Sequence, residues 1–141
     1  MIEFMYGLLK TVGFAHPLHP AVTHIPMGMI MGAFFFRAAA LFLKMDYLAK
    51  SAYYCVVLAI IGIPPTVFFG ITDWQHKYGG EWEALIIYKM SAATVLTIVL
   101  GIIIKIDKPE EPAKDVRSLL YLVALMIAIS LGFSGGELMF G

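Results

Sequence analysis

Four long apolar runs dominate the sequence and leave few folds open to it. They cover residues 21–43, 51–72, 84–104 and 118–136, and the second and fourth runs contain no charged residue. A helix needs about 20 mostly apolar residues to cross a bilayer core, and lipid admits only helices or closed barrels. A membrane β-barrel would show alternating segments instead. The sequence therefore predicts an all-α integral membrane protein, with one four-helix bundle over residues 1–141.

The composition agrees with lipid as the solvent. Sixty per cent of the 141 residues are hydrophobic and 14% are charged, whereas a soluble domain carries about 25% charged residues. The formal net charge is zero, so no nucleic-acid partner is expected. The single cysteine excludes an intrachain disulfide.

Basic residues predict the orientation in the membrane. Four spans place both termini on one side, together with the connector between the second and third spans. The two connectors on the other side hold most of the basic residues: Lys44, Lys50, Lys105, Lys108, Lys114 and Arg117. The positive-inside rule places these connectors in the cytoplasm. We therefore expect a multi-pass inner-membrane protein with both termini in the periplasm.

Three further expectations concern the polar parts of the chain. Residues 105–117 read as a solvated loop without a binding role. Arg37 lies in the cytoplasmic half of the first span and is expected to snorkel to the surface. Residues 1–15 do not resemble a cleaved signal peptide, and their apolar positions share one helical face, which is typical of an interfacial helix.

All four histidines fall at the predicted periplasmic face. His16, His19 and His24 surround the start of the first span, and His76 follows the second. Histidine is the commonest metal ligand in proteins, and ionisable groups at membrane depth are functional candidates. Pro17 and Pro20 disfavour helix in the residues before them, which predicts an extended approach with the first helix starting near Thr23.

The run HPLHPAVTHIPMG at residues 16–28, the four spans and GGEL at 135–138 resemble the DUF2231 family of predicted membrane proteins. Members of this family resemble parts of electron-transfer systems, so the resemblance implies a haem. The family also leads us to expect a polar or histidine residue early in the third helix. Tyr88 and Lys89 stand at that place here.

A six-coordinate haem b needs two neutral imidazoles on opposite faces of the porphyrin. His24 begins one helix and His76 ends the next at a similar depth, so these two are the predicted axial ligands. His16 and His19 would form a second site or support the first. Other residues could complete the site: Lys77 and Lys89 would meet propionates, and Trp74, Trp82, Phe14, Phe68 and Phe69 would pack the macrocycle.

Two other interpretations of the histidines remain open. A Zn or Cu ion could be bound by His16, His19 and His24, because histidine suits both metals. The histidines could instead be structural groups of an interfacial anchor. An aromatic belt at the membrane surface would also explain the tryptophans without any cofactor.

Small residues and prolines predict how the helices pack. Gly28 and Gly32, and likewise Gly132 and Gly136, have the spacing that permits close helix contact. The prolines at 64–65 are expected to kink the second helix, because they remove backbone donors.

The sequence as a whole favours a subunit of a larger complex. We expect a membrane electron-transfer subunit that binds haem b near the periplasmic face. It would link the quinone pool to a periplasmic redox partner such as a c-type cytochrome. The alternative is a non-enzymatic membrane anchor or scaffold whose histidines are structural or bind a metal ion. No pairing of nucleophile and base predicts an enzyme.

Overall fold

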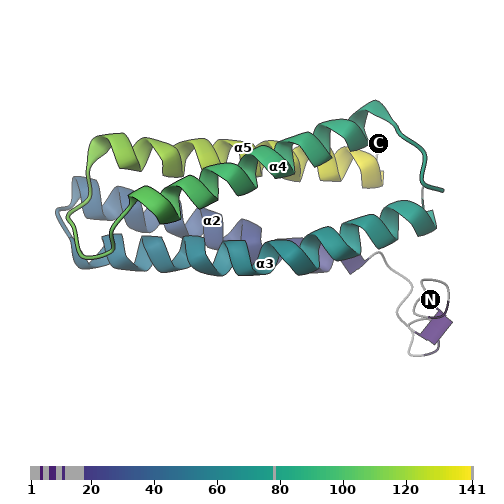
Figure 1. Ribbon diagram of the computed structural model, residues 1–141, viewed down its shortest axis with the longest axis horizontal. Coiled ribbons are helices and arrows are strands. Elements are labelled where there is room, and N and C mark those ends of the chain that lie inside the picture. Colours follow the sequence, from purple (N-terminus) through teal and green to yellow (C-terminus); the bar gives the residue numbers. More distant parts are fainter. Residues whose placement is uncertain (1–3, 5–6, 9–10, 12–17, 78, 141) are drawn as a thin grey trace.

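The computed structural model describes residues 4, 7–8, 11, 18–77 and 79–140, and these residues form four long helices and no strand. The helices are α2 (Leu18–Phe42), α3 (Tyr47–Lys77), α4 (Ala84–Ile106) and α5 (Asp115–Phe140). Each is long and apolar enough to cross a membrane by length and composition. The predicted all-α architecture is confirmed, and Figure 1 shows the helices side by side in an elongated bundle.

Most helix ends lie a few residues outside the predicted spans, because hydropathy marks the part in hydrocarbon and omits the polar turns beyond it. The start of α2 corrects our prediction, since helix begins at Leu18 and not near Thr23. Pro20 lies in the first turn, where a missing N–H costs no hydrogen bond. The Thr23 hydroxyl donates to the Pro20 carbonyl instead of capping the helix. The interfacial helix predicted at residues 1–15 lies largely outside the described residues.

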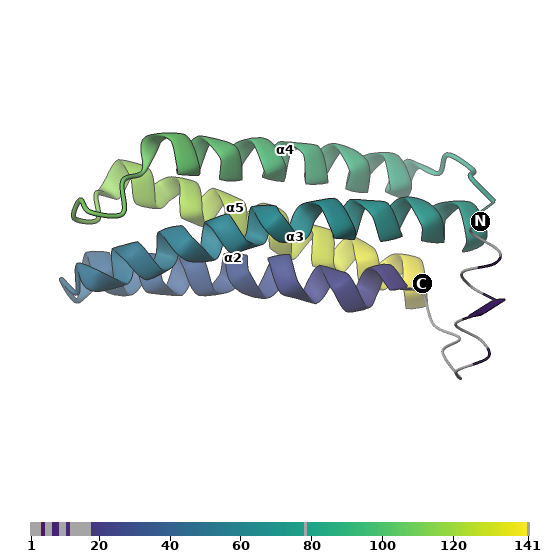
Figure 2. The same ribbon diagram turned by 60° about the horizontal axis from the view of Figure 1, so that its bottom comes forward.

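The helices run alternately up and down, so the bundle has two chemically different ends (Figures 1 and 2). We call one the histidine end; it contains the start of α2, the end of α3, the start of α4 and the end of α5. We call the other the arginine end; it contains Arg37 and the connectors at residues 43–46 and 107–114. The most extensive helix pairing is between α2 and α3.

The two halves of the bundle are packed differently. Apart from Pro26 and Ile86, the buried apolar residues of the described helices lie at the middle of the bundle or toward the arginine end, and Leu100 and Ile103 there are fully buried. Toward the histidine end the buried residues of the described helices are mostly polar: Thr72, Asp73 and Ser134, with Pro26 and Ile86. The buried apolar core therefore lies in the middle and the arginine-end half of the bundle, and the histidine-end half has few buried apolar side chains.

Small residues allow α2 to approach its neighbours closely. A Cβ added at Gly62 of α3 would lie 3.3 Å from Pro26 Cδ, and one at Gly132 of α5 would lie 3.4 Å from Met27 Cε. Gly32 likewise faces Cys55 within the bundle. These glycines thus serve contacts inside one chain. The helix α3 continues through the two prolines at 64–65 as one element.

A buried ion pair crosses the arginine end and corrects the prediction that Arg37 snorkels. Arg37 is only 1% exposed, and its Nη1 donates to Asp107 Oδ2 at 2.9 Å. Its Nε donates to Ser118 Oγ at 3.0 Å, and its guanidinium lies 5.1 Å from the centre of the Tyr121 ring. The Tyr121 hydroxyl donates to the same Asp107 oxygen at 2.7 Å. Snorkelling is unnecessary because the bundle itself supplies the counter-charge.

The connector at residues 107–114 is also more than a solvated loop. Arg117 bridges Asp107 and Glu111, so the buried pair continues to the surface. Hydrogen bonds from Arg117 and Lys108 lower the pKa of Glu111 to about 2. Glu111 therefore stays ionised at neutral pH and holds the connector against the start of α5.

Candidate functional site

His19 lies at the histidine end with its side chain turned toward α3. Its Nδ1 is 3.0 Å from the Thr66 carbonyl oxygen. Its backbone N–H donates to Asp73 Oδ2 at 2.8 Å, so a carboxylate of α3 satisfies a donor at the start of α2, where helices leave donors unpaired. Thr66, Gly70 and Asp73 recur every three or four residues and lie on one face of α3. That face fixes both the backbone and the ring of His19.

Gly70 is the position on α3 that admits the imidazole. A Cβ at Gly70 would lie 3.0 Å from His19 Nδ1 and 3.1 Å from Cε1. Such contacts are tighter than ordinary van der Waals packing, so the ring would have to move away from the Thr66 carbonyl. The close approach of α2 and α3 here depends on the missing side chain.

Replacing Gly70 with alanine is therefore expected to destabilise the protein, because overpacking typically costs about 1–3 kcal/mol. Gly101→Ala is the matched control, since it is also a change within a helix and its added Cβ meets no atom within 4 Å. Thermal unfolding in detergent should give a lower Tm for G70A than for G101A. Equal Tm values would contradict the close packing of the His19 ring against Gly70.

Lys89 brings a positive charge to the same region from α4. Its side chain is half-buried, and its ammonium group interacts electrostatically with the His19 ring. Its Nζ lies 3.7 Å from where a Cβ of Gly135 would be, so it reaches toward α5. The ammonium makes no hydrogen bond or ion pair with any residue that the structure describes. An unpaired charge at membrane depth is costly and marks a functional candidate.

His24 faces the opposite way. It lies five residues after His19, which turns it roughly 140° around the helix, and its side chain is exposed on α2. Its Nδ1 is 2.5 Å from the Pro20 carbonyl oxygen of its own helix. His19 and His24 therefore do not share a site within one chain. Of the predicted site residues whose contacts it gives, the structure brings Lys89 near His19, and it packs Trp74 against Trp82 and Phe68 against Phe69.

The other predicted site residues lie around this centre. His76 is half-buried in the last turn of α3. Trp74 donates from Nε1 to the Glu81 carbonyl at 2.8 Å and meets Trp82 edge-on with ring centroids 4.8 Å apart. The contacts of these two tryptophans hold the connector between α3 and α4 against the end of α3. His16 and the side chain of Lys77 lie outside the described part of the chain.

His19 and His24 share one chemical feature despite their different directions. In each ring Nδ1 bonds a backbone carbonyl, while Nε2 has no hydrogen-bond partner among the described residues. A neutral imidazole in this state carries its proton on Nδ1 and keeps the Nε2 lone pair. Histidines that bind metals are commonly oriented by such a bond at the other ring nitrogen. Within residues 18–77 and 79–140, no group of three or more His, Cys, Asp or Glu side chains is placed to hold a metal ion.

Sequence reasoning missed Thr66 and Gly70 as parts of the site. The signal available was their spacing with Asp73 on one face of α3, but a span apolar on all sides does not show which face meets α2.

Comparison with known proteins gives a family and nothing finer. A family profile described as a predicted membrane protein (DUF2231) matches residues 15–141. No curated protein and no solved structure matches the chain.

Proposed function

The chain belongs to the DUF2231 family of predicted membrane proteins, and on this basis we propose that it is a membrane electron-transfer subunit that binds haem b at the histidine end. The observation that carries the proposal is the state of the His19 ring. Its Nδ1 is held by the Thr66 carbonyl, and its Nε2 is free among the described residues. His19 thus has the orientation and lone pair that an axial ligand needs.

The surrounding residues fit a haem in three respects. The histidine-end half of the bundle has few buried apolar side chains among the described residues, so no tightly packed apolar core encloses His19. The unpaired ammonium of Lys89 suits a propionate, because a buried charge needs an opposite charge. The lipid-spanning helices supply the apolar medium that a b-type haem prefers. When bound, the haem would supply one-electron transfer.

In this proposal His76 would be the second residue that holds the haem. It lies on α3 three residues after Asp73, whose carboxylate accepts from the His19 backbone. His19 therefore replaces His24 in the predicted pair, because His24 projects away from the bundle. His24 remains suited to a contact outside the chain, either with a partner subunit or with a second haem.

A single Zn or Cu ion has less support. His19 and His24 lie on different sides of α2, so they do not converge on one ion. An anchor or scaffold function needs no cofactor at all. It is the result that would follow if the purified protein held neither haem nor metal.

The test is the absorption spectrum of the full chain, purified from cells supplied with iron and a haem precursor. We expect the bands of low-spin, six-coordinate haem b at one haem per chain. A folded protein without these bands would refute the proposal. Stoichiometric zinc or copper in that preparation would support the metal-ion alternative.

The orientation belongs to the same proposal, with the histidine end facing the periplasm of the inner membrane and membrane or periplasmic redox proteins as partners. The basic residues of the arginine-end connectors support it. In a Cys55→Ser background, a membrane-impermeant thiol reagent applied to intact cells should label Glu83→Cys but not Lys108→Cys. Both positions are exposed, so accessibility in detergent serves as the control. Labelling of Lys108→Cys in intact cells would reverse the orientation.

A further inference from the structure

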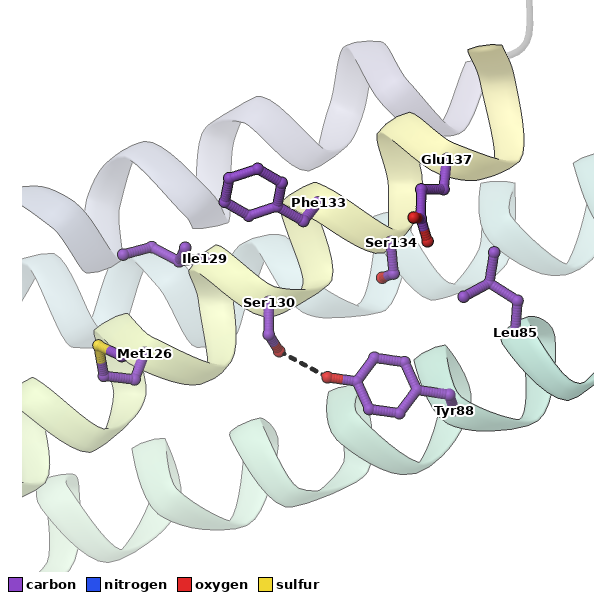
Figure 3. Close-up of a pocket in the computed structure, with 8 residues that line it drawn as sticks. All are labelled: Leu85, Tyr88, Met126, Ile129, Ser130, Phe133, Ser134 and Glu137. Carbon is purple, nitrogen blue, oxygen red and sulfur yellow. Dashed lines mark hydrogen bonds between the residues drawn. The ribbon is translucent and has the colours of Figure 1, made fainter. Parts of the chain in front are cut away.

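A groove runs between α4 and α5 in the histidine-end half of the bundle (Figure 3). Its volume is about 440 Å³, which is within the usual range of small-molecule sites. Met126 and Phe133 line it and are 59% and 76% exposed, so the groove opens sideways toward lipid. A ligand would therefore reach it from the membrane and must be soluble there.

The polar side chains gather toward the histidine end of the groove. Figure 3 shows Tyr88 reaching from α4 to Ser130 of α5, with Ser134 and Glu137 further along α5. Met126 and Ile129 line the opposite, apolar part. The groove thus has a polar end near the membrane surface and an apolar end toward the membrane interior. This gradient suits a molecule with a polar ring and a hydrocarbon tail.

The hydroxyl groups of the groove are all occupied as donors. The Tyr88 hydroxyl donates to Ser130 Oγ at 2.9 Å, and Ser130 Oγ donates to the Ile127 carbonyl at 3.0 Å. Ser134 Oγ donates to the Leu131 carbonyl at 3.0 Å. Each oxygen keeps a lone pair, and an ionised Glu137 carboxylate can only accept. The polar end therefore offers acceptors and no hydroxyl donor.

From this arrangement we infer that the groove binds the head group of a quinol and prefers it to the oxidised quinone. A quinol has two hydroxyl groups that can donate to the acceptor oxygens of the groove. A quinone has only carbonyl oxygens, which cannot donate to those acceptors. The ring of Tyr88 can pack against a flat aromatic head. The carboxylate of Glu137 disfavours a phosphate-bearing lipid head in the same place.

The inference rests on the proposed function in one respect, since a quinol is the reductant that a membrane electron-transfer subunit would draw on. The two sites are also neighbours, because Lys89 reaches Gly135 beside Ser134. Binding in the groove does not require haem. The protein could therefore bind haem without binding a quinol in the groove, or bind the quinol without haem, and the two measurements distinguish these cases.

The experiment measures calorimetric binding of duroquinol and duroquinone to the full chain in nanodiscs of phosphatidylcholine, under anaerobic conditions and with haem content determined separately. We expect duroquinol to bind about tenfold more tightly, which corresponds to one net hydrogen bond. Glu137→Gln should reduce this ratio, because an amide also donates. Tyr88→Phe should weaken duroquinol binding and leave duroquinone binding nearly unchanged.

Thr97→Val is the matched control, because Thr97 is an exposed α4 hydroxyl that donates to its own helix at Ala93 and lies outside the groove. It should change neither affinity. Equal affinity for the two forms, no binding of either, or the same effect from all three variants would overturn the inference. Displacement of duroquinol by added phosphatidylethanolamine would identify the groove as a lipid site instead and would also overturn it.

Discussion

Replacing Arg37 with methionine is expected to lower the free energy of unfolding by about 3–5 kcal/mol, because it removes the nearest cation of a buried carboxylate and leaves only Arg117, at 3.4 Å. The Asp107 side chain is only 2% exposed and receives both Arg37 Nη1 and the Tyr121 hydroxyl. Arg37→Lys should recover little of this loss. A single ammonium group cannot reproduce donation from Nε to Ser118 together with donation from Nη1 to Asp107.

The control for Arg37 is the exposed pair of Lys50 and Glu110. Its nitrogen–oxygen distance of 3.1 Å is similar, but the two side chains are 49% and 80% exposed. Lys50→Met should therefore cost at most about 1 kcal/mol. Unfolding of the detergent-solubilised protein by increasing amounts of SDS, followed by circular dichroism, compares the two variants. Equal losses would show that burial of the Arg37 pair has no energetic consequence.

The double variant R37M/D107L separates the loss of attraction from the penalty of an unpaired charge. Replacing both partners of a buried ion pair with apolar residues is often nearly neutral. We expect R37M/D107L to be more stable than R37M, although the Tyr121 hydroxyl then loses its acceptor. A double variant as unstable as the sum of the single variants would indicate two independent contributions.

His19→Ala is expected to abolish the low-spin haem bands, whereas His24→Ala should preserve the haem of the bundle. The two histidines form a matched pair, because both lie on α2 and both bond a backbone carbonyl through Nδ1. They differ in direction, since only His19 faces α3. His76→Ala should have the same effect as His19→Ala if His76 is the second axial ligand.

A structural role of His19 would also perturb the spectrum if the variant unfolded. Added imidazole distinguishes the two cases, because it can occupy the vacated coordination position only in a folded protein and should restore the low-spin bands of His19→Ala. Loss of haem from His24→Ala with retention in His19→Ala would contradict our assignment. That result would favour the pair of His24 and His76 predicted from the sequence.

Most of the candidate site could be located from the sequence, but its composition could not. Counting four spans placed all the histidines and Lys89 at one end, because an even number of crossings fixes which segments share a side. The sequence did not show that His19 turns inward and His24 outward. A helix that began five residues later, near Thr23, would have left His19 in an extended segment with no defined direction.

The sequence by itself determined that this chain forms four membrane helices with its histidines at one end. Each apolar run is long enough to cross the bilayer, and a helix satisfies its own backbone hydrogen bonds in lipid, so other secondary structures are excluded for these runs. Only the tertiary structure decided which face of each helix turns inward. In water an apolar stripe marks the buried face of a helix, but these spans are apolar on all sides, because lipid and bundle interior are equally nonpolar. Arg37 and Asp107, 70 residues apart, pair only after helix packing has fixed the rotation of α2 against α4 and α5.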